Sequence, residues 1–225
     1  MIAGEGKRPV EEQAVRIPLD GAGVFGDLSV PRGAKGLVLF AHGSGSSRFS
    51  PRNRFVARRL QERGLATLLL DLLTAQEEQE DAGTGRYRFD VTLLADRLLR
   101  AVAWTANHDD LRGLRVGLFG ASTGAAAALR AAAADPEGVA AVVSRGGRPD
   151  LAREVLLLVR APTLLIVGGA DEPVLQLNRE AFRLLTCEKR LEVVPGAGHL
   201  FEEPGALERV ADLAADWFAR YLASS

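Results

Sequence analysis

Hydrophobic residues gather in six short runs from residue 36 onward, and longer segments with helical spacing separate them. The runs lie at 36–43, 66–73, 115–120, 139–144, 163–169 and 190–196. Each run is apolar on both faces that a strand would have, which is typical of strands covered by helices on both sides. The helical patterns lie near 52–63, 90–107, 123–134, 175–185 and 205–222. This alternation predicts an α/β fold with a doubly wound, mostly parallel sheet.

The first thirty residues have a different pattern. Residues 14–31 read AVRIPLDGAGVFGDLSVP, two strand-like segments around a glycine-containing turn, and they predict an antiparallel hairpin at the sheet edge. Because the sequence has no internal repeat and no linker-like stretch, we expect a tail at 1–13 and a single domain at 14–225. The longest irregular stretch, 73–89, is acidic and predicts a solvated loop or a short helix, although loops of this length are often functional.

Composition and charge narrow the class of protein. The chain has 225 residues, 47% hydrophobic and 25% charged, and its 28 Lys and Arg nearly balance its 29 Asp and Glu. This balance predicts no nucleic-acid partner and no membrane partner. No apolar run has the length of a signal peptide or a membrane span, so we expect a cytoplasmic protein. The single cysteine, Cys187, excludes an intramolecular disulfide and a multi-cysteine metal site. A homodimer is compatible with the sequence, but no feature requires one.

Residues 120–124, GASTG, fit the pattern G-x-S-x-G between a predicted strand and a predicted helix. A serine on such a sharp turn has a strained backbone and needs small neighbours two residues away on either side. Its hydroxyl then projects beside the N-terminus of the following helix, where negative charge is stabilised. Ser122 is therefore a candidate nucleophile. The alternative is that Ser122 only caps the helix.

A serine nucleophile needs a histidine as its base, and the sequence has three. His108 stands at a predicted helix end and is expected at the surface. His42 directly follows a strand and is expected to hold the next loop by hydrogen bonds. His199, in VVPGAGHLF, follows the last strand and precedes the last helix, so its loop lies over the same sheet edge as Ser122. His199 is the candidate base, with a buried or capping role as the alternative.

The carboxylate that orients the histidine should lie between serine and histidine in the chain. Asp171 does so, in LLIVGGADEPV, just after the strand predicted at 163–169. Asp171 could instead cap the next helix, and Glu172 is the second choice of acid. Serine, aspartate and histidine thus occur in the required order, each after a parallel strand, at the edge where α/β sheets bind ligands.

Residues 42–47, HGSGSS, follow the first buried strand and supply candidate donors for an oxyanion hole. The backbone N–H of Thr123 is the first expected donor and that of Ser44 the second, with Gly43 as its substitute. A phosphate-binding loop is the alternative reading. However, no lysine follows at the spacing of a P-loop, and the glycines do not fit G-x-G-x-x-G.

With these motifs the chain resembles the α/β-hydrolase superfamily and, within it, the dienelactone hydrolase family, over nearly its whole length from about residue 14. The resemblance implies an α/β-hydrolase fold without a large cap domain, the catalytic residues Ser122, Asp171 and His199, and no metal or organic cofactor. The enzymes that give the family its name use a cysteine nucleophile, whereas this chain has Ser122. Some serine-bearing members are fused to phosphoribosyltransferase domains, and we expect no such domain in these 225 residues.

The expected activity is hydrolysis of a carboxylic ester or lactone, a small-molecule acyl substrate, through an acyl-enzyme on Ser122. A thioesterase or a peptidase would use the same three residues. A catalytically silent binding module of the same fold is an alternative of another class, and the fold alone does not exclude a lyase or a perhydrolase.

Arginine binds carboxylates through a bidentate fork, so arginines near the sheet edge are candidate contacts for an anionic substrate. Arg145, in VVSRGGRPD, is the first choice because it ends the strand next to that of Ser122. The others are Arg52, Arg54, Arg86, Arg88 and Arg148. For each of them the alternative is a solvated side chain or a pair with a nearby acid.

Overall fold

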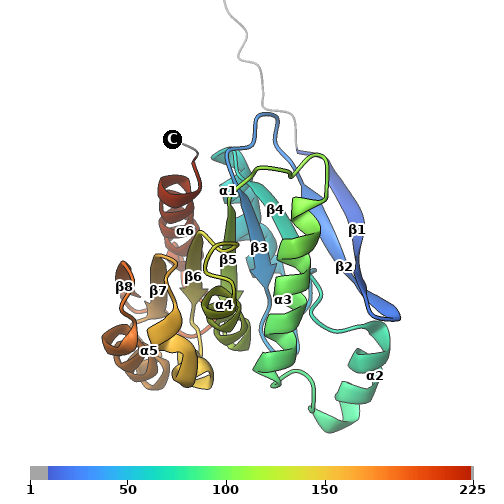
Figure 1. Cartoon of the computed structure of the whole chain (residues 1–225). Helices are drawn as coiled ribbons and strands as arrows, with labels where there is room; N and C mark the ends of the chain where they lie inside the picture. The colour runs from blue at the N-terminus through green and yellow to red at the C-terminus, as the bar shows by residue number, and fades with distance from the viewer. Residues whose placement is uncertain (1–9, 224–225) are drawn as a thin grey trace, which may run out of the picture.

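The computed structural model describes residues 10–223, and most of the predicted tail, 1–9, lies outside them. An eight-stranded sheet crosses the molecule (Figure 1), with the strand order β1-β2-β4-β3-β5-β6-β7-β8. The strands are β1 (Glu12–Leu19), β2 (Ala22–Ser29), β3 (Leu37–Ala41), β4 (Ala66–Leu70), β5 (Val116–Ala121), β6 (Ala141–Arg145), β7 (Thr163–Gly168) and β8 (Lys189–Val194). β1 and β2 form the predicted antiparallel hairpin. β2 also runs antiparallel to β4, and all remaining pairs are parallel. The predicted fold class is confirmed.

Helices cover both faces of this sheet. They are α1 (Pro51–Glu62), α2 (Ala75–Thr84), α3 (Val91–Ala106), α4 (Thr123–Ala134), α5 (Glu172–Leu184) and α6 (Ala206–Leu222), with the 3-10 segment η1 (Pro149–Leu158). α1 and α6 pack on one face, whereas α3, α4, η1 and α5 contribute to the core on the other. Within residues 10–223 no insertion forms a large cap domain, and no helix is both long and apolar enough to span a membrane.

The strand order brings the β3 and β5 ends together at the carboxyl edge. After β3 the chain moves outward to β4, and after β4 it returns across β3 to β5. Ala41, the last residue of β3, therefore pairs with Gly120 near the end of β5. A reversal of strand order of this kind leaves a crevice at the carboxyl edge, where α/β proteins bind their ligands.

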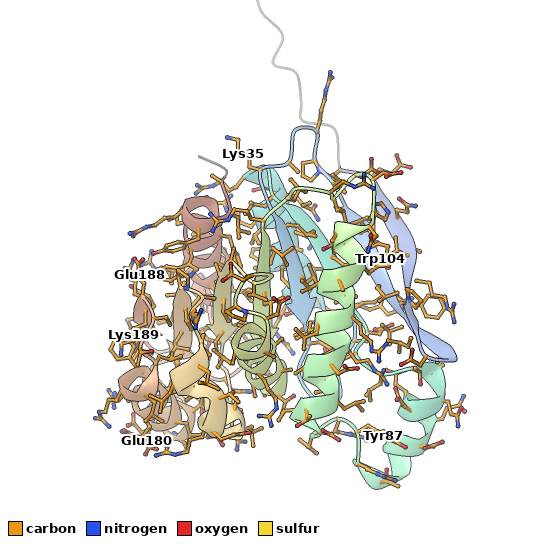
Figure 2. The ribbon with its side chains drawn as sticks, viewed as in Figure 1. Lys35, Tyr87, Trp104, Glu180, Glu188 and Lys189 are labelled. Atoms are coloured by element: carbon orange, nitrogen blue, oxygen red, sulfur yellow. The ribbon has the colours of Figure 1, made fainter. Side chains whose placement is uncertain are left out.

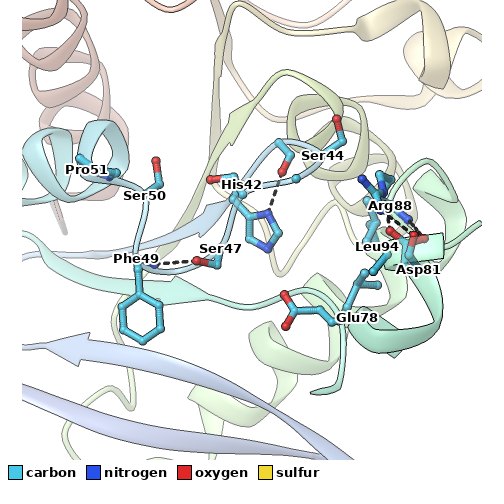
Figure 3. A pocket seen from close by; sticks show the side chains of 15 residues that line it. His42, Ser44, Ser47, Phe49, Ser50, Pro51, Glu78, Asp81, Arg88 and Leu94 are labelled. Carbon is cyan, nitrogen blue, oxygen red and sulfur yellow. Dashed lines mark hydrogen bonds and ion pairs between the residues drawn. The ribbon is translucent and has the colours of Figure 1, made fainter. Parts of the chain in front are cut away.

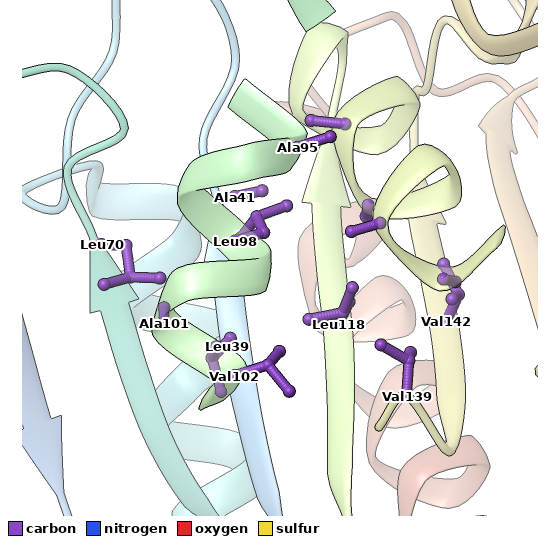
Figure 4. Close-up of a cluster of buried hydrophobic side chains, with 14 of the residues drawn as sticks. Leu39, Ala41, Leu70, Ala95, Leu98, Ala101, Val102, Leu118, Val139 and Val142 are labelled. Carbon is purple, nitrogen blue, oxygen red and sulfur yellow. The ribbon is translucent and has the colours of Figure 1, made fainter. Parts of the chain in front are cut away.

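The core on the α3 and α4 face places an alanine-rich helix close to the sheet (Figure 4). Leu39 on β3, Leu98 on α3 and Leu118 on β5 are all fully buried there. α4 reads TGAAAALRAAAA, and its short side chains let the helix axis lie near β5. Burial of such residues from water supplies the main driving force for folding, about 25 cal/mol per Å² of apolar surface.

β8 differs from its prediction as a strand buried on both faces. It is the outer strand of the sheet, and five of its six residues are only partly buried or exposed. Lys189 stands at this edge (Figure 2), and its ammonium group donates to the carbonyls of Phe182 and Leu185 at the end of α5. A charged side chain on an outer strand blocks pairing with another sheet, which explains the polar positions in this run.

The acidic stretch after β4 contains a well-formed helix, α2. Its N-terminus has a capping box, in which the Thr74 hydroxyl accepts from the Glu77 N–H and the Glu77 carboxylate accepts from the Thr74 N–H. Gly85 ends α2 in the left-handed conformation. The sequence TAQE carried this signal, because S/T-x-x-E before a helical segment is typical of a helix start.

We expect Leu118→Ala to lower the free energy of unfolding by about 2–5 kcal/mol, because it leaves a cavity between β5 and α4. The matched control is Leu157→Ala, since Leu157 is 62% exposed, and it should change stability by less than about 0.5 kcal/mol. Urea unfolding followed by circular dichroism measures both values. Equal losses in the two variants would contradict this view of the core.

Candidate active site

Ser122 lies on a strained turn between β5 and α4. Its backbone angles are φ 51° and ψ −120°, a region that residues with a side chain rarely adopt. A side chain on Gly120 would place its Cβ 2.4 Å from the Cα of Ala125, and one on Gly124 would stand 2.3 Å from the carbonyl oxygen of Ala41. The Ser122 hydroxyl makes no capping hydrogen bond to α4. The turn therefore has the predicted strain and needs the predicted glycines, and the capping alternative does not describe this serine.

His199 and Asp171 form a hydrogen-bonded pair. The Nδ1 atom of His199 lies 2.7 Å from Oδ2 of Asp171, whose side chain is 14% exposed. Asp171 is the N-cap residue of α5, but its side chain makes no capping hydrogen bond. The Ala170 N–H donates to the Ala197 carbonyl at 2.9 Å, which joins the two loops through their backbones. Glu172, the second choice of acid, instead accepts from Gln176 on the surface of α5.

The end of β6 connects this pair to the serine. The Ser122 N–H donates to the Arg145 carbonyl at 3.2 Å. A Cβ on Gly146 would lie 3.5 Å from Nδ1 of His199, so Gly146 packs against the imidazole ring. Among the described residues the Ser122 hydroxyl makes no hydrogen bond to His199. Such bonds are often long in enzymes without substrate and shorten in the reacting complex.

The loop after β3 lies beside Ser122. A Cβ on Gly43 would be 3.1 Å from the Cβ of Ser122, so the two backbones nearly touch. The N–H of Ser44, the second candidate oxyanion donor, donates to the Thr123 hydroxyl oxygen at 2.9 Å. The Thr123 side chain is buried. The structure thus brings the two candidate donor residues together, and in this state the Ser44 N–H has a side-chain acceptor.

His42 holds this loop. The Leu72 N–H donates to its Nε2 at 3.3 Å, so the proton of the neutral ring resides on Nδ1, which donates to the Gly43 carbonyl at 2.9 Å. Burial lowers the pKa of His42 below its usual value, against the opposing hydrogen bond to Gly43 and the charge of Asp71. His42 is therefore a neutral structural residue, as the sequence predicts.

A partly buried network of charges that the sequence did not predict fixes the far end of this loop. Arg48 pairs with both Asp27 on β2 and Asp71 after β4, and Arg54 pairs with Asp27 at 2.6 Å. The Arg48 N–H also donates to Asp71 at 2.9 Å. No local motif reveals such a network, because its members come from three separate segments of the chain.

A cavity of about 570 Å³ lies between the loop after β3 and α2 (Figure 3). Gly43 and Ser44 line it on one side, and Glu78 of α2 lines it on the other. The Arg88 side chain also lines it and is paired with the buried carboxylate of Asp81. Ser122 and His199 do not line this cavity, which approaches the serine through Gly43. The position of α2 beside this cavity could not be read from its acidic composition.

The candidate arginines differ in their partners. Four pair with acids, as the alternative for each proposed: Arg52, Arg54, Arg88 and Arg148. The Arg86 guanidinium lies over the Tyr87 ring, 5.5 Å from its centroid. Arg145 is buried on the side of the sheet that faces α1, and among the described residues its guanidinium donates only to Asn53 Oδ1, at 3.4 Å. Whether Arg145 contacts substrate stays a prediction.

Cys187 lies far from the serine. It contacts Thr163 at the beginning of β7, which is the amino edge of the sheet. Burial raises the pKa of its thiol, and a neutral thiol is a weak nucleophile.

Comparison with known sequences decides the family. A sequence model described as the dienelactone hydrolase family matches residues 26–223. The chain belongs to the dienelactone hydrolase family. The resemblance inferred from the sequence is confirmed, and membership of this family supports an enzyme of the hydrolase kind.

Solved structures agree with this family. A dienelactone hydrolase from Anabaena variabilis has 58% sequence identity and a TM-score of 0.93, over 95% of this chain and 99% of that one. A cold-adapted esterase from an Arctic intertidal metagenomic library has a TM-score of 0.76 at 20% identity, over 98% of both chains. The second likeness shows the α/β-hydrolase fold alone.

Two curated relatives from Mycobacterium tuberculosis strains carry the name of a phosphoribosyl transferase. Each is 54% identical over 214 residues, which is 95% of this chain and 47% of the relative. This member of the dienelactone hydrolase family therefore spans about half the length of the curated relatives it matches.

The strain at Ser122 predicts a difference between two substitutions. The free energy of unfolding should be about 1 kcal/mol higher for Ser122→Gly than for Ser122→Ala. Glycine adopts φ 51° without steric strain, and the greater chain entropy of glycine in the unfolded state offsets only part of this stabilisation. Chemical denaturation of both proteins measures the difference. A lower stability for Ser122→Gly would mean that the turn is unstrained.

The buried His42 predicts a pH dependence of stability. The unfolded chain binds a proton near pH 6.5 and the folded chain only at lower pH, so the free energy of unfolding should fall as the pH falls below 6.5. His42→Asn should flatten this slope between pH 6.5 and 5 in denaturant titrations. His108→Asn, which removes a histidine at the opposite edge of the sheet, is the matched control. An unchanged slope in His42→Asn would contradict the assignment.

Proposed function

We propose that the chain hydrolyses a carboxylic ester or lactone of a small molecule through a covalent intermediate on Ser122. The observation that carries the proposal is the 2.7 Å contact between His199 Nδ1 and Asp171, at the same sheet edge as a serine with φ 51°. A carboxylate on Nδ1 leaves Nε2 as the basic nitrogen of the ring, which is the arrangement that serine hydrolysis needs.

In the proposed reaction the Ser122 oxygen attacks the acyl carbonyl while His199 Nε2 accepts the hydroxyl proton. Asp171 stabilises the imidazolium that forms. The tetrahedral intermediate collapses, the bond to the leaving oxygen breaks, and His199 gives its proton to the leaving alcohol. Water then attacks the acyl-enzyme by the reverse proton path, and the carboxylic acid leaves.

The oxyanion of the intermediate would bind the N–H groups of Thr123 and Ser44, with Gly43 as the substitute donor. The Ser44 N–H lies 2.9 Å from the Thr123 hydroxyl, so this hydroxyl must give up that contact when the oxyanion forms. Loss of one oxyanion donor typically lowers the rate by about 100- to 1,000-fold.

The other readings of the site concern its substrate and its activity. A thioesterase or a peptidase would use the same residues, and rates on an ester, a thioester and an amide with the same acyl group distinguish them. We infer that the transferase activity named for the mycobacterial relatives belongs to the part of those proteins outside the match. The support is that the dienelactone hydrolase model covers residues 26–223 of this chain.

The test uses a fluorophosphonate probe, intact-mass spectrometry and ester hydrolysis. Wild type should gain one adduct and hydrolyse short 4-nitrophenyl esters. Ser122→Ala should gain none, and its kcat should fall by about 10⁴-fold or more. Asp171→Asn should lose about 10³- to 10⁴-fold, because the imidazole tautomer is no longer fixed.

Cys187→Ala is the matched control and should keep both the adduct and the activity, since its thiol lies at the opposite edge of the sheet. A folded wild type with neither adduct nor ester turnover would overturn the proposal. The binding-module reading would then take its place.

A further inference from the structure

Arg145 is a buried cation without an acidic partner. Its side chain extends from the end of β6, and the residue is 8% exposed. Its Nε and Nη1 atoms are buried without a hydrogen-bond partner among the described residues, and its Nη2 reaches only Asn53. Burial of a charged group is unfavourable unless the group is paired. A protein tolerates such a residue when a ligand supplies the missing partner.

Arg52 adds a second positive charge at the same place. Its Nε atom is also buried without a partner in the described part of the chain. Burial, and secondly the charge of Arg52, lower the pKa of Arg145 to about 10. The acid that contacts Arg52 is Glu202, at 3.5 Å and with a side chain that is 68% exposed, so it compensates little of the positive charge.

Arg52 lies at a helix end that favours an anion, and the backbone of Arg145 adjoins the reacting groups. Arg52 is in the first turn of α1, and the dipole of this helix attracts negative charge to its N-terminus. Arg145 gives its carbonyl to the N–H of Ser122, and the following residue, Gly146, packs against His199. The Arg52 side chain is 34% exposed, so the site is accessible from solvent along it.

The cavity beside α2 does not suit an anion. Its charged lining is Glu78 and the Asp81–Arg88 pair, so its net charge is negative and it disfavours anions. An anionic group near the serine is therefore better placed on the side of Arg145.

We propose that Arg145 and Arg52 bind an anionic oxygen group, a carboxylate or a phosphate, and that this group belongs to the substrate. Asn53 holds the Arg145 guanidinium from α1, and the unpaired nitrogens of the two arginines donate to the anion. The assignment of the anion to the substrate rests on the proposed hydrolase function. The anion site itself does not.

The direct test is thermal unfolding in chloride buffer with and without inorganic phosphate, at constant ionic strength. At a tenfold excess over its Kd, phosphate should raise the Tm of wild type by about 3 °C. The shift should vanish in Arg145→Met and shrink in Arg52→Gln. The matched control, Arg112→Gln, removes an exposed arginine and should keep the full shift.

The outcomes of this test are distinct. No shift in wild type, or equal shifts in all four proteins, would overturn the anion site. Should Arg145→Met fail to fold, Arg52→Gln decides the question, because Arg52 lies partly at the surface. A shift that is lost in Arg145→Met, reduced in Arg52→Gln and unchanged in Arg112→Gln would support the site.

A second test assigns the anion to the substrate. 4-Nitrophenyl butyrate and the 4-nitrophenyl monoester of succinic acid share a leaving group and a four-carbon acyl chain, and only the second carries a carboxylate. We expect kcat/KM for the succinyl ester, divided by kcat/KM for the butyryl ester, to fall by about 10- to 100-fold in Arg145→Met. The fall corresponds to the loss of one hydrogen-bonded charge pair with the substrate. Arg112→Gln should keep the wild-type ratio, and phosphate should compete with the succinyl ester.

The two tests can fail separately. A phosphate shift that depends on the arginines, combined with an unchanged ratio of esters, would mean that the site takes a free anion, and the substrate assignment would be overturned. If neither ester is hydrolysed, the proposed function fails, and the phosphate shift still decides the anion site.

Discussion

The close contact between the first turn of α4 and the end of β3 is the constraint on which the site depends. Gly124 stands so near the carbonyl of Ala41 that no side chain fits between them. This contact forces the chain to leave β5 and enter α4 within one residue, and Ser122 absorbs the resulting backbone strain. The alanine-rich sequence of α4 has the same origin, because larger side chains would push the helix away from the sheet.

Around this fixed point the site is built mainly from backbone. The loops after β7 and β8 are joined by the hydrogen bond from Ala170 to Ala197, and the end of β6 accepts the N–H of Ser122. Ion pairs between side chains support the loops, such as those of Arg48 with Asp27 and Asp71. Because these loop contacts are made by the backbone, they depend little on side chains, whereas the turn at the serine tolerates no side chain on Gly120 or Gly124.

The sequence predicted the parts of the molecule that follow from local patterns. Strands, helices and the GASTG turn have short-range signals, and chain order selected Asp171 and His199 from many acids and three histidines. The burial of β8 was overpredicted, because its place at the sheet edge follows from strand order and not from its own residues. The network around Asp27, the cavity wall formed by α2 and the bond from Ser44 to Thr123 join segments far apart in the chain. A single sequence has no signal for such contacts.

The hydrogen bond from the Ser44 N–H to the Thr123 hydroxyl has a consequence for the timing of catalysis in the proposed mechanism. The Thr123 hydroxyl accepts from the Ser44 N–H that the oxyanion needs, so the oxyanion must displace this hydroxyl from the N–H. A neutral carbonyl oxygen is no stronger an acceptor than a hydroxyl, whereas an alkoxide is much stronger. The exchange therefore becomes favourable only as negative charge develops. The Thr123 hydroxyl would thus compete with bound substrate for the Ser44 N–H, and this N–H would stabilise the transition state more than the substrate.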